Sequence, residues 1–274
     1  MKISTRRLSE NTDANRCHLF SRTTVLSTAT IIILLLIWET ITGFELISPL
    51  YLPSPQEVVA KLWDLSINGY MGASLFEHSA SSLMRISIAL LVAIFLGLPT
   101  GLAIGLNANA RAIIDPLIEI YRPVPPLAYL PLIVIWFGIG EFSKVFLIFL
   151  AIFAPIVVAT AAGVRKVDPL CVRVTQSLGG NRNQVIRYVI VPSILPDILT
   201  GIRIGLGAGW STLVAAELIA ATSGLGFMIQ SASQFLMTDQ VIAGILVIAL
   251  IAFLLEVFLR YLQKKFAPWQ SVRD

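Results

Sequence analysis

Six stretches of predominantly apolar residues, each about twenty residues long or longer, constrain this chain more than any other feature. A bilayer core of roughly 30 Å is crossed by a helix of about 20 apolar residues, and a helix pairs its backbone polar groups within one segment. The alternating pattern of a transmembrane β-barrel is absent. We therefore expect an all-α membrane protein with six transmembrane helices. The expected spans are 25–44, 86–106, 113–137, 145–164, 198–221 and 241–262.

The composition excludes an ordinary soluble protein. Hydrophobic residues make up 56% of the chain and charged residues 13%, about half of the roughly 25% typical of soluble domains. The net charge of +4 comes from short segments between the apolar runs, so no nucleic-acid partner is expected. The first run is too long for a signal-peptide core and is expected to be retained. Cys17 and Cys171 lack metal-ligand spacing, and neither a metal site nor a catalytic site is expected.

The distribution of Lys and Arg predicts that both termini face the cytoplasm. Basic residues accumulate in cytoplasmic segments near the ends of spans. With the N-terminus inside, 16 of the 20 Lys and Arg residues fall on the cytoplasmic side and three, including Arg85, fall outside. The connections would be a cytoplasmic tail at 1–24, a periplasmic connection at 45–85, a cytoplasmic loop at 165–197 and a cytoplasmic tail at 263–274.

The internal loop 165–197 carries local signals for two helices. Asp168-Pro169 is an N-cap followed by a proline at the first helical position, and Gly179-Gly180 is a helix C-cap. Asn181 can cap a second short helix that ends at Pro192. This helix–turn–helix either rests on the lipid headgroups or docks a cytoplasmic partner. The physics of the residues leaves both interpretations open.

The run from Arg173 to Pro192 is similar to the EAA loop of ABC-importer permeases. That pattern reads E-A-A-x-x-x-G, nine further residues and then I-x-L-P. Gly179 takes the place of the glycine, whereas Arg173, Val174 and Thr175 replace the E-A-A triplet, so no role of its glutamate carries over. The resemblance implies that seven residues couple the chain to an ATPase. These are Arg173, Thr175, Ser177, Leu178, Gly179, Val189 and Pro192.

Four further runs are similar to the taurine, sulfonate, nitrate and bicarbonate branch of these permeases, and most of all to its taurine permeases. They are 121–128, 136–140, 209–217 and 223–226. The resemblance covers about residues 25–270 and implies a type I ABC importer (MetI-like) fold with a permease domain at about 78–262. It also implies a homodimer in the lipid of the bacterial inner membrane, with a cytoplasmic ABC ATPase dimer and a periplasmic substrate-binding protein.

The implied activity is ATP-driven translocation of taurine, or a related aliphatic sulfonate, by alternating access. The sequence has no G-x-x-x-x-G-K-[ST] phosphate loop, so we expect no enzyme activity and no cofactor in this chain. ATP and Mg²⁺ would be bound by the partner ATPase. A permease for nitrate, bicarbonate or another small solute of the same family is the alternative. A secondary ion-coupled carrier is a weaker one, because the expected inverted repeats are not evident.

Prolines in the third span predict a kinked or unwound segment from Arg122 to Leu130. Non-helical backbone at membrane depth is tolerated where it is buried or lines a cavity, so this segment is a candidate for the translocation pathway. Glu119 is placed to neutralise Arg122. In the fifth span, Glu217 is expected to form a salt bridge or position a helix, since a carboxylate would repel an anionic sulfonate. The candidate pathway residues are Arg122, Pro125, Pro126, Tyr129, Trp210, Ser211 and Glu217.

Glycines recur every four residues in the second and fifth spans. Such small-xxx-small faces let helix backbones approach closely, and static packing is the favoured interpretation over a sliding seam. The glycines are Gly97, Gly101 and Gly105 in one span and Gly201, Gly205 and Gly209 in the other.

Overall fold

The computed structural model describes residues 25–267, and its regular secondary structure over this range is helical, apart from an isolated bridge between Tyr70 and Ala73. The predicted tail at 1–24 and the last seven residues of the tail at 263–274 lie outside the described residues. Five helices there are long and apolar enough to cross a membrane, and a bent pair brings the number to as many as six. The arrangement is that of an all-α, multi-span protein.

Four of the five spanning helices are longer than the apolar runs that predicted them, and the first, Val25–Gly43, matches its run to within one residue. The five helices are Val25–Gly43, α3 (Leu75–Leu106), α6 (Glu141–Lys166), Arg182–Ile219 and α11 (Thr238–Phe266). The bent pair consists of α4 (Ala108–Tyr121) and the segment Pro126–Phe137, which is made of η1 (Pro126–Tyr129) and α5 (Leu130–Phe137); the two parts meet at 88°. The shorter helices are α2 (Pro55–Ile67), α7 (Pro169–Ser177), α8 (Arg182–Val185) and α10 (Leu225–Gln234).

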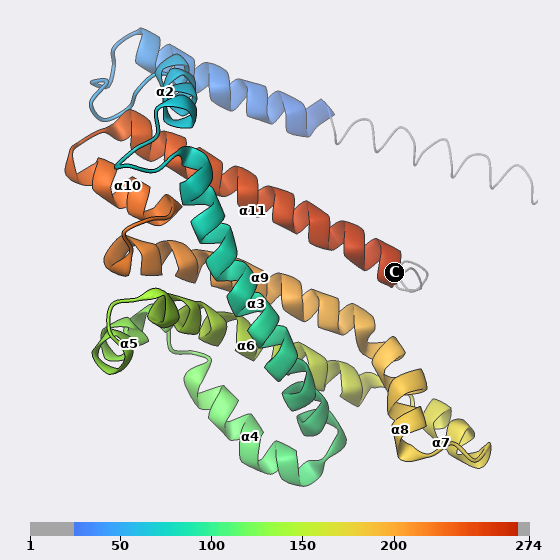
Figure 1. Ribbon diagram of the computed structural model, residues 1–274. Coiled ribbons are helices and arrows are strands. Elements are labelled where there is room, and N and C mark those ends of the chain that lie inside the picture. The colour runs from blue at the N-terminus through green and yellow to red at the C-terminus, as the bar shows by residue number, and fades with distance from the viewer. Residues whose placement is uncertain (1–24, 268–274) are drawn as a thin grey trace, which may run out of the picture.

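Three helices, α3, α6 and α9 (Val191–Ala220), form the centre of the molecule. In Figure 1 they cross at its middle, and α6 contacts both of the others. Ile148, Ile152 and Ile156 of α6 are fully buried in the main apolar cluster. The most buried spanning helix is therefore α6, which is consistent with its near-continuous apolar sequence.

Both glycine series face α6. A Cβ on Gly101 of α3 would lie 2.6 Å from the Thr160 Cβ and 2.8 Å from the Val157 carbonyl oxygen. A Cβ on Gly209 of α9 would lie 2.5 Å from the Ile152 Cγ1. The absence of a side chain at these positions allows α3 and α9 to approach α6 closely, as static packing requires.

The helix α3 begins eleven residues before the predicted start of the second span at residue 86. A capping box starts it: the Ser74 side chain accepts from the backbone N–H of Glu77, and the Glu77 carboxylate accepts from that of Ser74. The added turns carry His78, Ser82 and Arg85, which are all buried. These polar residues lower the local hydropathy. The predicted span therefore starts at residue 86, although the buried helix starts earlier, at Leu75.

The second helix of the internal loop does not end at Pro192. Helix α8 runs through a π turn, η2 (Ile186–Ile190), directly into α9, so residues Arg182–Ile219 form one helix. In a π turn the hydrogen bonds skip one residue more than in an α-helix, and the Val191 N–H donates to the Ile186 carbonyl. This wider turn lets the helix continue past Pro192, which lies in the first turn of α9.

Candidate functional site

A helical hairpin, α7 followed by α8, projects at one end of the molecule, away from α5 and α10 (Figure 1). Asp168 caps α7 by accepting from the Leu170 N–H at 2.8 Å, and Pro169 occupies the first helical position. Asn181 and Gln184 form a reciprocal capping box at the start of α8. Each arm of the hairpin therefore has its own local start signal.

The turn between the arms is a Schellman motif. The N–H of Gly180 donates to the Thr175 carbonyl and the N–H of Gly179 to the Gln176 carbonyl, both at 3.0 Å. Gly179 adopts φ +85°, a left-handed conformation that costs an L-residue with a side chain roughly 1–2 kcal/mol. The predicted C-cap at Gly179-Gly180 is confirmed, and it fixes the angle between α7 and α8.

One side of the hairpin is anchored in the core and the other is exposed. Val185 and Ile190 are buried in the same apolar cluster as the centre of α6. Leu178, by contrast, is 83% exposed at the tip, and Leu170 and Val174 are also exposed. A capped hairpin with one anchored side and an apolar exposed side is a rigid docking surface.

The seven predicted coupling residues all lie on this hairpin or directly after it. Thr175 and Ser177 direct their hydroxyls to backbone carbonyls of α7, those of Cys171 and Arg173, at 2.9 Å. Val189 lies in the π turn and is half-buried. The exposed members of the set are Arg173, Ser177, Leu178, Gly179 and Pro192.

A buried ion pair between Arg85 and Glu217 joins α3 to α9. The Arg85 Nη1 is 2.6 Å from the Glu217 Oε1, and both side chains are at least 96% buried. The same guanidinium also binds Glu141, at the start of α6, through Nε at 2.6 Å and Nη2 at 2.9 Å. The expectation of a salt bridge at Glu217 is confirmed. The structure places Arg85 within α3 rather than in a loop, and its charge is satisfied inside the protein.

The Glu217 carboxylate also organises the turn between α9 and α10. It accepts from the backbone N–H of Gly226 at 2.9 Å, and the Ser82 hydroxyl lies 2.8 and 2.9 Å from its two oxygens. Gly224 passes so close that a Cβ on it would lie 2.5 Å from the Glu217 Cδ, and its φ is +126°. Only glycine fits this position without displacing the ion pair.

His78 completes this buried network. Its Nδ1 accepts from the Gly224 N–H at 3.1 Å, and its Nε2 lies 3.1 Å from the Tyr70 carbonyl oxygen. The network thus links α3, α6, α9 and the start of α10 through charge-assisted hydrogen bonds, which are stronger than neutral ones. The sequence did not reveal the roles of Arg85, Glu141, Ser82 and His78; among the charged members of the network, only Glu217 was singled out.

The third span is broken as the prolines predict. Tyr121 ends α4, and the chain turns through Pro123 and Pro125 into η1. The Tyr129 hydroxyl donates to the Tyr121 carbonyl across the break at 3.1 Å. The expected pairing of Glu119 with Arg122 is not observed: no ion pair joins these two described residues, and both are exposed.

The predicted pathway residues do not form one cluster in the structure. Arg122, Pro125, Pro126 and Tyr129 lie at the break, and η1 contacts α9 and α6. Glu217 belongs to the buried network. Trp210 lines a hollow between α9 and α11. Ser211 is exposed and donates to the Gly207 carbonyl of its own helix at 3.3 Å.

Comparison with known proteins places this arrangement in a family. The model of a family described as binding-protein-dependent transport system inner membrane component matches residues 66–268, more than half of the chain. The chain belongs to this family. It is thus a multi-pass inner-membrane component of a transport system, and it works with separate ATPase and substrate-binding components. The matched range includes the predicted permease domain at 78–262.

Individual relatives support this assignment. The taurine transport system permease protein TauC of Escherichia coli (strain K12) is 59% identical, over 92% of this chain and 92% of that protein. A relative from Bacillus subtilis (strain 168), SsuC, is named for aliphatic sulfonate transport and is 37% identical over 87% of this chain and 85% of its own length. The inward-facing MetNI methionine ABC transporter shares the fold, with a TM-score of 0.61 at 15% identity over 68% of this chain and 93% of that one.

Proposed function

We propose that this permease imports taurine, or a closely related aliphatic sulfonate, as the membrane-spanning subunit of an ATP-driven importer. The 59% identity to a taurine permease across almost the whole chain supports the substrate. Two copies of the chain would enclose the pathway, with lipid around the outward apolar surface. A periplasmic binding protein would deliver the substrate at the end of the molecule that carries α2 and α10.

The observation that carries the proposed mechanism is the continuity of the helix Arg182–Ile219. At about 1.5 Å per residue, its 38 residues extend for about 57 Å. Its first turns form one arm of the exposed hairpin, and its last turns contain Glu217 of the buried network. A displacement of the hairpin would thus be transmitted along one continuous helical element to the opposite end of the bundle.

In this mechanism the ATPase subunits supply the chemistry and this chain supplies the conformational change. The ATPase dimer would bind the exposed side of the hairpin, with Leu178, Val174 and Leu170 as apolar anchors. ATP and Mg²⁺ would be held by that partner, because this chain has no phosphate loop. Closure of the ATPase dimer would then convert the permease between inward-facing and outward-facing states.

Uptake of labelled taurine by cells that lack their own taurine permease tests the proposal. The chain, expressed together with its ATPase and binding protein, should restore uptake, and unlabelled taurine should compete better than nitrate or bicarbonate. If the chain is in the membrane but taurine uptake is absent, the substrate assignment is wrong. If nitrate or bicarbonate competes better than taurine, the chain serves the alternative substrate.

A further inference from the structure

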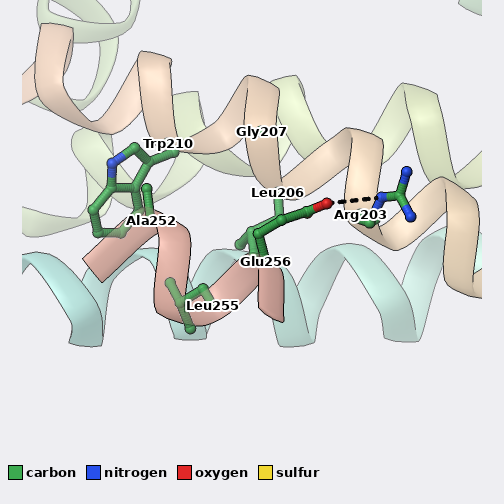
Figure 2. Close-up of a pocket in the computed structure, with 7 residues that line it drawn as sticks. All are labelled: Arg203, Leu206, Gly207, Trp210, Ala252, Leu255 and Glu256. Atoms are coloured by element: carbon green, nitrogen blue, oxygen red, sulfur yellow. Dashed lines mark ion pairs between the residues drawn. The ribbon is translucent and has the colours of Figure 1, made fainter. Parts of the chain in front are cut away.

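A hollow of about 120 Å³ lies between α9 and α11 (Figure 2). A hollow of this size has room for several waters or for one small solute. Its lining combines two opposite charges with apolar side chains. The residues are Arg203, Leu206, Gly207, Trp210, Ala252, Leu255 and Glu256.

Both charges of the hollow lie within spanning helices. Arg203 belongs to Arg182–Ile219, and Glu256 lies ten residues before the end of α11 at Phe266, or about 15 Å along the helix. Both residues also fall inside the spans predicted from the sequence, 198–221 and 241–262. Ionisable residues within spanning helices are costly, and they are candidates for substrate or ion pathways.

The two charges face each other at one end of the hollow. The Arg203 Nε is 3.2 Å from the Glu256 Oε1, and the Arg260 Nε is 2.8 Å from the same oxygen. Two guanidinium groups thus share one carboxylate, which leaves an excess of positive charge. Figure 2 shows Trp210 at the opposite end of the hollow, beyond Leu206 and Ala252. The Trp210 indole N–H has no hydrogen-bond partner among the described residues.

We propose that this hollow is a transit site for a zwitterionic aminoalkanesulfonate. The sulfonate would bind Arg203, the ammonium would bind Glu256, and the alkyl chain would lie against Trp210 and Ala252. A guanidinium offers parallel N–H donors that match an oxyanion. Each protein charge exchanges one opposite partner for another, so no charge is left unpaired in the membrane. This site rests on the proposed function and deepens it, because it selects for the amine as well as for the sulfonate.

A purely structural ion pair between α9 and α11 is the competing explanation. Such a pair needs no hollow beside it. Here the side chains of Arg203 and Glu256 are 35% and 33% exposed, and the space next to them is open. The geometry is that of a pair accessible to a third charged group.

Equilibrium binding of labelled taurine tests the site directly. The permease–ATPase complex in lipid nanodiscs, without binding protein or nucleotide, should bind taurine saturably, and ethanesulfonate, which lacks the amine, should compete weakly. Glu256→Gln should weaken taurine binding about tenfold or more, the loss expected for a hydrogen bond between charged groups, without weakening ethanesulfonate competition. Arg203→Gln should weaken both. Asp115→Asn removes a carboxylate from another ion pair, with Arg165 at 4.0 Å, and should change neither.

The possible outcomes distinguish a failure of the proposed site from a failure of the proposed function. Wild-type taurine uptake by cells is measured in parallel, and its failure defeats the proposed function. If wild type imports taurine but its complex does not bind it, or if the Glu256 and Arg203 variants bind it like wild type, the site is wrong while the function stands. If Glu256→Gln weakens both ligands equally and lowers the melting temperature, the pair is structural and the site is also wrong.

Discussion

Glu217 binds three kinds of donor with one carboxylate: the Arg85 guanidinium, the Ser82 hydroxyl and the Gly226 backbone N–H. Such an arrangement compensates the cost of removing a charge from water, because every oxygen retains a hydrogen bond. The carboxylate therefore acts as a structural joint between α3, α9 and α10. A direct contact with an anionic substrate is not part of this role.

Neutralising Glu217 should destabilise the protein strongly. Glu217→Gln leaves the buried Arg85 with one carboxylate partner, Glu141, whose side chain is 62% exposed. Breaking a buried ion pair costs about 3–5 kcal/mol. We expect a lower melting temperature in detergent, measured by fluorescence-detected size-exclusion chromatography. Glu119→Gln, at an exposed carboxylate without an ion pair among the described residues, is the control and should melt like wild type. If the two variants had equal melting temperatures, Glu217 would not have this structural role between α3, α9 and α10.

For single residues, the sequence predicts a role when the interacting groups are close along the chain, and it does not when the partner is distant. The caps at Asp168 and Gly179 are readable because each acts within a few residues. The role of Arg85 could not be predicted in this way, because its partner Glu217 is 132 residues away along the chain. Hydropathy consequently assigned Arg85 to a connection outside the membrane. Any charged residue at the edge of an apolar run carries this ambiguity.

Among the elements, α6 is the one that organises the core. Both glycine faces, on α3 and on α9, rest against it. The four-residue spacing of these glycines predicts a close helix contact, but it does not identify the partner helix. The short helix α10 was not predicted, because it is only ten residues long and its N-cap is Gly224, a glycine packed against Glu217 and the distant residue Arg85.

A side chain on the α3 face should disturb this contact. Gly101→Ala places a Cβ within 2.8 Å of the Val157 carbonyl oxygen, so the helices must separate, at a cost of about 1–3 kcal/mol. Gly207→Ala is the matched control, since a Cβ there meets no atom within 4 Å. The melting temperature should fall for Gly101→Ala and stay or rise for Gly207→Ala. The reverse order would show that α3 and α6 are not in this contact.

The hairpin turn should tolerate residues according to their left-handed propensity. Gly179→Val forces a β-branched residue to φ +85°, whereas asparagine adopts this region more readily. We expect Gly179→Val to reduce taurine uptake and co-purification of the ATPase by about fivefold or more, which corresponds to about 1 kcal/mol or more. Gly179→Asn should retain most of both. If the two variants behaved alike, the turn geometry would have no part in coupling.

Considered as a whole, the molecule has the hairpin at one end and the α2 and α10 region at the other (Figure 1). The distribution of Lys and Arg predicts that the hairpin end is cytoplasmic. Two exposed positions report on this orientation. Cys171 is a free, exposed cysteine on α7, and Ile67 is exposed at the end of α2.

Labelling with a membrane-impermeant maleimide should therefore depend on the side of the membrane. In a Cys17→Ser background, Cys171 should react in inverted vesicles and remain unlabelled in intact cells whose outer membrane is permeabilised. The Ile67→Cys variant, with Cys171→Ser added, should show the opposite pattern. Labelling of Cys171 from the outside would invert the predicted topology and remove the hairpin from the reach of a cytoplasmic ATPase.

The central claim is that ATP hydrolysis by a partner drives taurine through this chain by way of the hairpin. The most direct measurement is accumulation of labelled taurine in proteoliposomes that contain the permease and its ATPase, with the binding protein added. We expect accumulation that requires ATP, Mg²⁺ and binding protein and that persists when ion gradients are collapsed. Accumulation that follows an ion gradient in the absence of ATP would contradict ATP-driven import and instead identify a secondary carrier.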